Sequence, residues 1–480
     1  MQTEKAAALA VIDEKSAECT FVSDEIWAYA ELSLKERRSA ALYRDMLEKE
    51  GFAVSAGLDG VETAVVGTFG SGRPVIGILA EYDALSGLSQ EACKAERLPL
   101  TDTDNGHGCG HNLLGAGAFG AALAVKAYLA ATGKPGTVVF YGCPGEEGGA
   151  AKAFFAKYGE WYKLDAALTW HPDDVNQVCS GSNMACIQTE YRYTGVAAHA
   201  AGAPEQGRSA LDAVELCNIG VQFLREHMKR SASIHYAVTD GGGLSPNVVQ
   251  PHAKVLYMVR DATVQDAVAL QARVDKIAEA AAMMTETTVH KRFIDGTANP
   301  VPNEPLERLL YANFAEIGAP QYTAEEWAFA EALRATYAAQ VSGLPGIASA
   351  CDETLADEIA ERTDGGKRAL NDFLMPFCHT SVTFPGSTDV GDVSWQTPTA
   401  QINCVTTASG TPGHSWQNVS AGKSTIAHKG MLTAAKVLAA AAIDLIADPS
   451  LLAPAKAYFD KAAAAGYCCP IPDGAKPEIV

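Results

Sequence analysis

Residues 185–294 decide the fold class, because they hold four strand-like runs and two helical runs in a distinctive order. The strands read ACIQTEYRYTG (185–195), SIHYAVTD (233–240), KVLYMVRD (254–261) and ETTVHKRFI (286–294). The helical runs are GRSALDAVELCNIGVQFLREHM (207–228) and VQDAVALQARVDKIAEAAAMM (264–284). Their order along the chain is β-α-β-β-α-β, which is the pattern of a small ferredoxin-like unit. We place this unit at residues 184–295.

The segments on either side of this unit predict one larger α/β domain. Strand-like runs alternate there with helical patterns, which favours a mixed, partly parallel sheet. These runs include TVVFYG (137–142), AALTW (166–170) and TAQINCVTT (399–407). The C-terminal part has no evident core of its own, so we expect residues 1–183 and 296–480 to form one discontinuous catalytic domain around the insert. Two domains also suit a chain of 480 residues.

Two further runs near the N-terminus predict a β-hairpin. They are VETAVVGTF (61–69) and PVIGILAEY (74–82), and the short, glycine-containing segment GSGR separates them. A connection of this length and composition is typical of a turn between neighbouring antiparallel strands.

The bulk composition excludes several classes of function. The chain carries 57 acidic and 37 basic side chains, for a formal net charge of −20, so it should repel nucleic acid and anionic membranes. The N-terminus lacks the pattern of a secretory signal. The apolar run MLTAAKVLAAAAIDLIA (431–447) is interrupted by Lys436 and Asp444, which favours a packed helix over a membrane span. The 12 cysteines show no framework spacing and indicate free thiols in a cytoplasmic protein.

Four short stretches contain residue types suited to metal chemistry. They are GHGCGHN (106–112), GCPGEEGG (142–149), TWHPD (169–173) and GTPGHSW (410–416). Thiolate and imidazole groups bind zinc and similar ions, and the carboxyl ends of strands are where α/β proteins place ligands. Each stretch also has a plain structural reading: a buried cysteine in a turn, acids at a helix N-terminus, or a hydrogen-bonded histidine.

Together the stretches supply cysteine, glutamate and three histidines, about the number of donors that a site for two divalent ions needs. Two neighbouring ions lower the pKa of a water molecule and stabilise a tetrahedral oxyanion. A free carboxylate beside them, Glu146 or Glu147, could accept the proton of that water and pass it to a leaving amine. The residues therefore predict hydrolysis assisted by two metal ions.

The motifs and their order resemble those of the co-catalytic metallopeptidase and amidohydrolase family of aminoacylase, hippurate hydrolase and carboxypeptidase G. The resemblance covers essentially the whole chain. It rests on AEYDAL (80–85), HGCGHN (107–112), PGEEGGA (144–150), WHP (170–172), GVAAHAAGAPEQGRSALDAV (195–214), SPNVVQ (245–250) and GHSW (413–416). It implies an α/β fold with a mixed-sheet catalytic domain and an inserted lid and dimerisation domain. It also implies two divalent metal ions per subunit, Zn or Mn.

The resemblance gives roles to residues of the four stretches. Glu146 corresponds to the catalytic base of the family. The metal ligands correspond to Cys109, His111, Glu147, His171 and His414. Many relatives have a His-x-Asp motif where this chain has Glu81-Tyr82-Asp83, a departure shared by the cysteine-containing branch, which suggests that Cys109 replaces the missing donor. Asp83 is then expected to orient one of the metal ligands through a hydrogen bond, without binding the metal itself.

Three residues of the insert also match the motifs of the family. His199 corresponds to a lid histidine that stabilises the oxyanion in the active site of the partner subunit, and Asn247 and Arg260 to residues that hold the substrate carboxylate. A guanidinium suits a carboxylate because its planar fork binds both oxygens. Without the resemblance, a helix cap at His199 and a surface position at Arg260 would be the favoured readings. The acidic pair Asp389 and Asp392 receives no role, and a plain loop is an equal reading there.

The expected activity is hydrolysis of the amide bond of an N-acyl amino acid with a free carboxylate, most closely one like p-aminobenzoyl-glutamate. Two other readings stay open: a dipeptidase or another acyl-amino-acid amidohydrolase, and a non-catalytic subunit that keeps the fold. A homodimer through the insert is expected, and a related partner subunit is a further alternative. No nucleic-acid or membrane partner is expected.

Overall fold

The larger part of the protein is a seven-stranded sheet in the order β1-β2-β4-β3-β5-β13-β6. The structure, a computed structural model, describes residues 3–340 and 343–478. The strands are β1 Ala53–Leu58, β2 Val61–Ser71, β3 Val75–Ala80, β4 Gly136–Gly142, β5 Ala166–Asp173, β6 Gln177–Val178 and β13 Thr399–Val405. Strands β4, β3, β5 and β13 are parallel, whereas β1, β2 and β6 pair antiparallel with their neighbours. This mixed sheet confirms the predicted α/β class.

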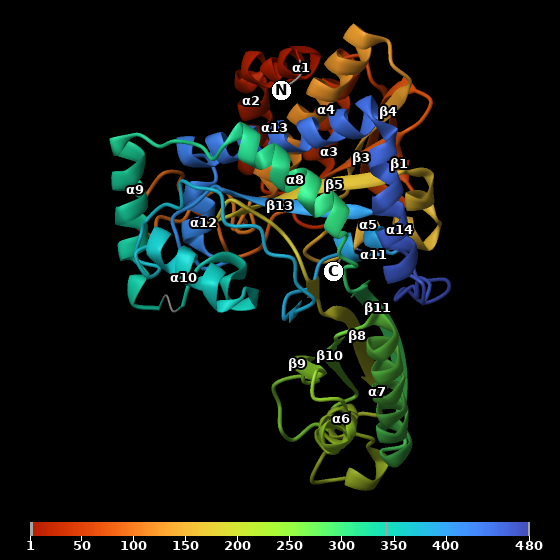
Figure 1. Ribbon diagram of the computed structural model, residues 1–480. Helices are drawn as coiled ribbons and strands as arrows, with labels where there is room; N and C mark the ends of the chain where they lie inside the picture. Colours follow the sequence, from red (N-terminus) through yellow and green to blue (C-terminus); the bar gives the residue numbers. More distant parts are fainter. Residues whose placement is uncertain (1–2, 341–342, 479–480) are drawn as a thin grey trace.

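Helices cover both faces of this sheet (Figure 1). They are α1 Thr3–Glu14, α2 Ser16–Tyr29, α3 Arg37–Lys49, α4 His111–Thr132, α5 Ala151–Lys157, α8 Glu304–Ile317, α9 Ala324–Ala335, α10 Glu353–Arg362, α11 Val390–Ser394, α12 Trp416–Ala421, α13 Thr425–Ala447 and α14 Leu452–Ala462. One apolar core packs α1, α2, α3, α4, α8 and α13 against one face, and a second packs α5 and α11 against the other. Helices α4 and α13 are long and apolar enough to cross a membrane, but 83% and 72% of their apolar windows are buried inside the protein.

The expected hairpin between residues 61–69 and 74–82 does not form. Both runs are strands, β2 and β3, but β4 lies between them, antiparallel to β2 and parallel to β3. All residues of β4 are buried, so this strand lies inside the sheet, where both of its edges find partners. The prediction was wrong because it weighed only the short connection, whereas the partner of β3 reaches it through helix α4.

A second sheet lies below the first in Figure 1. Its elements are β8 Ala185–Thr194, α6 Ala210–Leu224, β9 Ser233–Asp240, β10 His252–Asp261, α7 Val264–Met284 and β11 Thr288–Thr297. The strand order is β11-β8-β10-β9 and every pair is antiparallel. Helices α6 and α7 share an apolar core with the buried side chains of this sheet. The division into domains at residues 184 and 295 stays a prediction.

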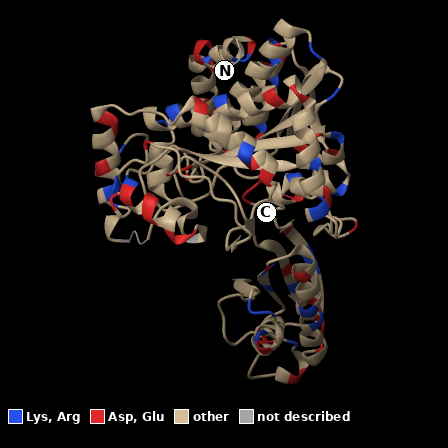
Figure 2. Ribbon diagram, in the orientation of Figure 1, with Lys and Arg blue, Asp and Glu red and all other residues tan. Residues whose placement is uncertain are grey.

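The chain returns from the second sheet to the first and brings distant segments side by side. Strand β13 pairs in parallel with β5, so residues that follow Val405 emerge at the same edge as those that follow β3, β4 and β5. Figure 2 shows acidic and basic residues interspersed along the helices of both parts, so the net charge of −20 is not gathered in one segment.

Candidate metal centre

The candidate residues of the larger part gather at the carboxyl ends of the parallel strands. Asp83 follows β3, Glu146 and Glu147 follow β4, His171 lies near the end of β5, and His414 lies beyond β13. Ligand sites of α/β proteins form at this edge, because the loops that leave parallel strands converge there.

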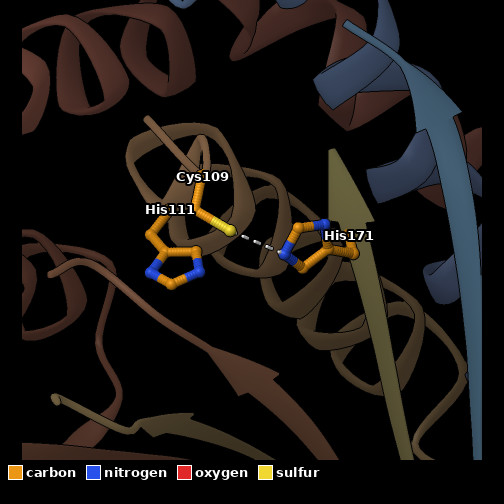
Figure 3. A group of neighbouring side chains, drawn as sticks. All are labelled: Cys109, His111 and His171. Carbon is orange, nitrogen blue, oxygen red and sulfur yellow. Dashed lines mark hydrogen bonds between the residues drawn. The ribbon is translucent and has the colours of Figure 1, made fainter. Parts of the chain in front are cut away.

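Cys109 and His111 enter through the glycine-rich turn that precedes α4. Gly110 has a φ of +79°, and a Cβ on it would lie 3.0 Å from Pro172, so a residue without a side chain is needed there. Sγ of Cys109 lies 3.3 Å from Nε2 of His171 (Figure 3). The ligand atoms of Cys109, His111 and His171 all lie within 4.8 Å of one another. The turn thus presents a sulfur and an imidazole to a second imidazole on β5.

A second group joins Cys109 to Glu147 and His414. Nε2 of His414 lies 3.2 Å from Oε1 of Glu147, and this carboxylate raises the pKa of His414 above its ordinary value. The backbone N–H of His414 donates to the carbonyl of Gly108 at 3.2 Å, which fastens the C-terminal return to the glycine-rich turn. The φ of His414 is +52°, an uncommon value for a residue with a side chain, so its surroundings hold this histidine in place.

A third group contains Glu81, His111 and Glu146. Nε2 of His111 lies 3.3 Å from Oε2 of Glu81 and 4.0 Å from Oε2 of Glu146. The other ring nitrogen, Nδ1, lies 2.9 Å from Oδ1 of Asp83, while Oδ2 of Asp83 accepts from the backbone N–H of Glu147 at 2.9 Å. Asp83 therefore turns Nε2 of His111 toward the group, which is how carboxylates behind metal-binding histidines act.

The charges around these groups are unbalanced toward the negative. Burial, and then neighbouring carboxylates led by Glu81, raise the pKa of Glu146 well above its ordinary value. Burial also opposes ionisation of Asp83, but the adjacent His111 and the hydrogen bonds outweigh it and hold the pKa of Asp83 well below its usual range. Several buried carboxylates at such short range favour the binding of cations.

The residues fit a metal centre. Two buried atoms that face each other at 3.3 Å, Oε2 of Glu81 and Nε2 of His111, make no hydrogen bond within the described residues. A buried polar atom without a hydrogen bond costs free energy, and a bound cation would satisfy both. The donors combine sulfur, imidazole nitrogen and carboxylate oxygen, a set that suits zinc or manganese.

Comparison with known proteins identifies the family. The profile of peptidase family M20/M25/M40 matches residues 77–443, which is most of the chain. The chain belongs to this family. It is 44% identical over 461 residues to the B-subunit of p-aminobenzoyl-glutamate hydrolase from Escherichia coli (strain K12), covering 95% of each chain. It is 28% identical over 327 residues to the Xaa-Arg dipeptidase of Homo sapiens, covering 64% of this chain and 70% of that protein.

A solved structure shares the fold. It is a protein of Bacillus subtilis described as a dinuclear metal binding peptidase, with a TM-score of 0.55 and 16% sequence identity, and the match covers 91% of this chain and 99% of that one. Membership of family M20/M25/M40 and these relatives make the chain a hydrolase of amide bonds. Its groups of cysteine, histidine and glutamate are candidate metal ligands for that chemistry.

The three candidates of the insert make their hydrogen bonds to residues other than the metal-centre groups. The backbone N–H of Ala200 donates to the carbonyl of Asn247 at 2.9 Å, so the loops of His199 and Asn247 lie together. Nδ1 of His199 accepts from the N–H of Gly202 at 3.1 Å within its own turn, and His199 does not cap the helix that follows, whose N-cap is Ala203. Nη1 of Arg260 donates to Oγ of Ser387 at 2.6 Å. Within residues 3–340 and 343–478, no hydrogen bond or ion pair joins His199, Asn247 or Arg260 to the metal-centre groups.

Two residues of the centre were not predicted from the sequence. Glu81 was treated as a departure from the His-x-Asp motif, yet its carboxylate faces His111 in the third group. Lys152, on α5, is fully buried and lies 2.6 Å from Oε1 of Glu81. The acid at the motif position was a usable signal for Glu81. Nothing in the spacing of Lys152 marks it, because its contact with Glu81 depends on how α5 packs on the sheet.

Proposed function

We propose that this chain hydrolyses the amide bond of N-acyl amino acids that carry a free carboxylate, with p-aminobenzoyl-glutamate as the leading candidate substrate. The observation that carries the proposal is the 44% identity, over 95% of both chains, to the B-subunit of the Escherichia coli p-aminobenzoyl-glutamate hydrolase. The donor groups at the strand ends and the acid pair Glu146–Glu147 support a catalytic chain over a non-catalytic subunit.

The proposed metal centre holds two divalent ions, Zn or Mn, through Cys109, His111, Glu147, His171 and His414. Such ions, when bound, supply Lewis acidity toward the substrate carbonyl and toward water. Sulfur and imidazole donors favour zinc, whereas carboxylate oxygens favour manganese, so this mixed set suits either ion.

Glu146 is the proposed base. It accepts a proton from the attacking water as the water oxygen bonds to the carbonyl carbon, and it donates that proton to the amide nitrogen as the C–N bond breaks. The products are the acid of the acyl group and a free amino acid. Asp83 keeps His111 oriented throughout, since its contact with Nδ1 leaves Nε2 directed to the centre.

The lid residues have proposed roles in binding. Arg260 and Asn247 hold the carboxylate of the leaving amino acid, and His199 stabilises the oxyanion. Closure of the second sheet over the first would bring Arg260 toward the substrate, whereas His199 would act across the dimer, in the active site of the partner subunit. Arg260 would then exchange its hydrogen bond with Ser387 for the substrate carboxylate.

The second sheet also offers a surface for the proposed homodimer. Strand β9 lies at the edge of its sheet, and an open edge is a template for pairing with another strand. Exposed apolar side chains accompany it: Tyr236 and Val238 on β9, and Ile219 and Phe223 on α6. The Escherichia coli relative is named as one subunit of its hydrolase, which makes a related partner chain the alternative.

The cysteines described are free thiols, which supports the proposed cytoplasmic location.

The test is amine release from p-aminobenzoyl-glutamate by purified chain loaded in turn with Zn and Mn. Release by the chain alone supports the proposed substrate and a homo-oligomer. No release from protein that holds two ions would remove this substrate from the proposal.

The second candidate, a dipeptidase, is favoured by the 28% identity to the Xaa-Arg dipeptidase of Homo sapiens. A panel of dipeptides with C-terminal arginine or lysine in the same assay separates the two candidates.

A further inference from the structure

A buried ion triple lies behind the candidate metal centre, and no role given so far accounts for it. Nζ of Lys152 lies 2.6 Å from Oε1 of Glu81 and 2.6 Å from Oδ1 of Asp389. The side chains of Lys152 and Asp389 are fully buried, and that of Glu81 exposes 3% of its surface. Charges are rarely buried so completely without a specific function or a specific set of partners.

The triple holds Glu81 in a defined orientation. Asp389 binds Lys152 twice, because its Oδ2 also accepts from the backbone N–H of Lys152 at 3.0 Å. This double contact fixes the start of α5 and with it the ammonium group. The ammonium then occupies Oε1 of Glu81 and leaves Oε2 as the oxygen that faces Nε2 of His111, 3.3 Å away.

Oε2 of Glu81 has no hydrogen-bond partner among the described residues, and neither does Nε2 of His111. If Glu81 served only to neutralise Lys152, both of its oxygens could turn to the ammonium or to backbone N–H groups. Instead one oxygen is held by the lysine, and the other lies 3.3 Å from an imidazole nitrogen with which it makes no hydrogen bond. The ligand atoms of Glu81, His111 and Glu146 lie within 4.8 Å of one another, which is a spacing that a metal ion can bridge.

The charge of the triple points the same way. Lys152 supplies one positive charge between two carboxylates, so the triple by itself carries one net negative charge, which lies on the side of His111. The ligand atom of Glu146 lies within 4.8 Å of those of Glu81 and His111. A buried excess of negative charge is stabilised by a cation.

We propose that Glu81 is a further metal ligand, donating through Oε2, and that Lys152 and Asp389 are positioning residues that present this oxygen to the ion on the His111 side. The inference rests on the proposed function in one respect, that the chain binds divalent metal. It adds a hard oxygen donor to a centre that also contains a soft cysteine sulfur. It therefore also predicts that Glu81 matters more for Mn²⁺, which prefers oxygen ligands, than for Zn²⁺.

The experiment measures metal binding rather than turnover. Metal-free full-length protein is titrated with Mn²⁺ and with Zn²⁺ against a competing chelator, and bound metal per chain is measured by mass spectrometry after dialysis. The variants are Glu81→Gln, which keeps the shape and removes the charge, and Glu81→Asp, which keeps the charge and withdraws it by one methylene. Lys152→Met and Lys152→Arg test the positioning role.

Lys5→Met is the matched control. Lys5 is a second buried lysine, and its Nζ lies 2.7 Å from Asp444 and 2.6 Å from the side-chain oxygen of Asn313, on α1, α13 and α8. Losing this lysine also leaves a carboxylate without its cation, but Lys5 is no part of the metal-centre groups. Its variant should bind both metals as the unaltered protein does.

We expect Glu81→Gln and Glu81→Asp to weaken Mn²⁺ binding by about tenfold or more, with a smaller loss for Zn²⁺, as for the loss of groups that order a metal site. Lys152→Arg should lose less affinity than Lys152→Met. Unchanged Mn²⁺ affinity and stoichiometry in folded Glu81→Gln and Glu81→Asp would overturn the inference. A loss of Mn²⁺ affinity in Glu81→Gln but not in Glu81→Asp would also overturn it. The negative charge would then be enough without an oxygen that reaches the ion. If the unaltered protein bound no metal, the proposed function itself would fail, which is a separate and distinguishable result.

Discussion

Replacement of Glu146 by glutamine isolates the proton-transfer step. Its carboxylate lies 4.0 Å from Nε2 of His111, beyond hydrogen-bonding distance, so an amide of the same shape should leave the fold and the metal ligands in place. A positioned acid–base group contributes about 10²- to 10⁴-fold to a rate. At about 1.36 kcal/mol for each factor of ten, that corresponds to about 2.7–5.4 kcal/mol of transition-state stabilisation.

The surroundings of Glu146 place the expected loss near the upper end of this range. Three other carboxylates lie near Glu146, but each already has a partner: Glu81 and Asp389 pair with Lys152, and Glu147 pairs with His414. None of them is free to take over the transfer of the proton. The variant should therefore lose activity by about 10³- to 10⁴-fold in kcat, with little change in KM.

The assay is steady-state amine release from p-aminobenzoyl-glutamate, together with bound metal per chain. A suitable control is Glu18→Gln, on α2, whose carboxylate pairs with Lys15 and Lys49 away from the centre; it should keep full activity. If Glu146→Gln retained two metal ions and more than a tenth of the original kcat, the role of Glu146 as base would be refuted.

Three further outcomes are expected. Asp83→Asn should weaken metal binding by about 10- to 100-fold, because His111 loses the anion that orients it; chelator competition measures this. Lys5→Met should lower the free energy of unfolding by about 2–3 kcal/mol without loss of metal, less than for a fully buried pair because Asp444 is 27% exposed; urea titration checks it. Burial raises the pKa of Asp392 to about 8, so its contribution to stability is present below about pH 4 and is lost as pH rises toward 8. Asp392→Asn should flatten that part of the stability profile, and an unchanged slope in thermal unfolding between pH 4 and 8 would count against it.

The sequence by itself determined the features that are local along the chain. The alternation of strands and helices gave the α/β class, since hydrophobic periodicity follows directly from which face of an element is buried. The short motifs around Glu146, His171 and His414 could be found because each follows a strand, and the ends of parallel strands meet at one edge. The motif around Cys109 could be found because its cysteine and histidine lie together in a glycine-rich turn. Family resemblance supplied the roles that residue types alone left open.

The order of strands in the sheet was not readable from local patterns. The hairpin expected between β2 and β3 fails because β4 enters between them, and β4 reaches that place only through the packing of α4 on the sheet. A turn signal describes the connection between two runs. It does not show whether a third strand pairs with both runs and so separates them in the sheet.

Only the tertiary structure decided the contacts between distant segments of the centre. Glu81, Lys152 and Asp389 come from the end of β3, the start of α5 and the residue before α11, and their separation in sequence carries no periodic signal. Their ion pairs exist because the helices pack in one arrangement on the sheet and exclude water there. Electrostatic and metal-binding properties depend on these short distances and on burial, and both are set by packing rather than by neighbours along the chain.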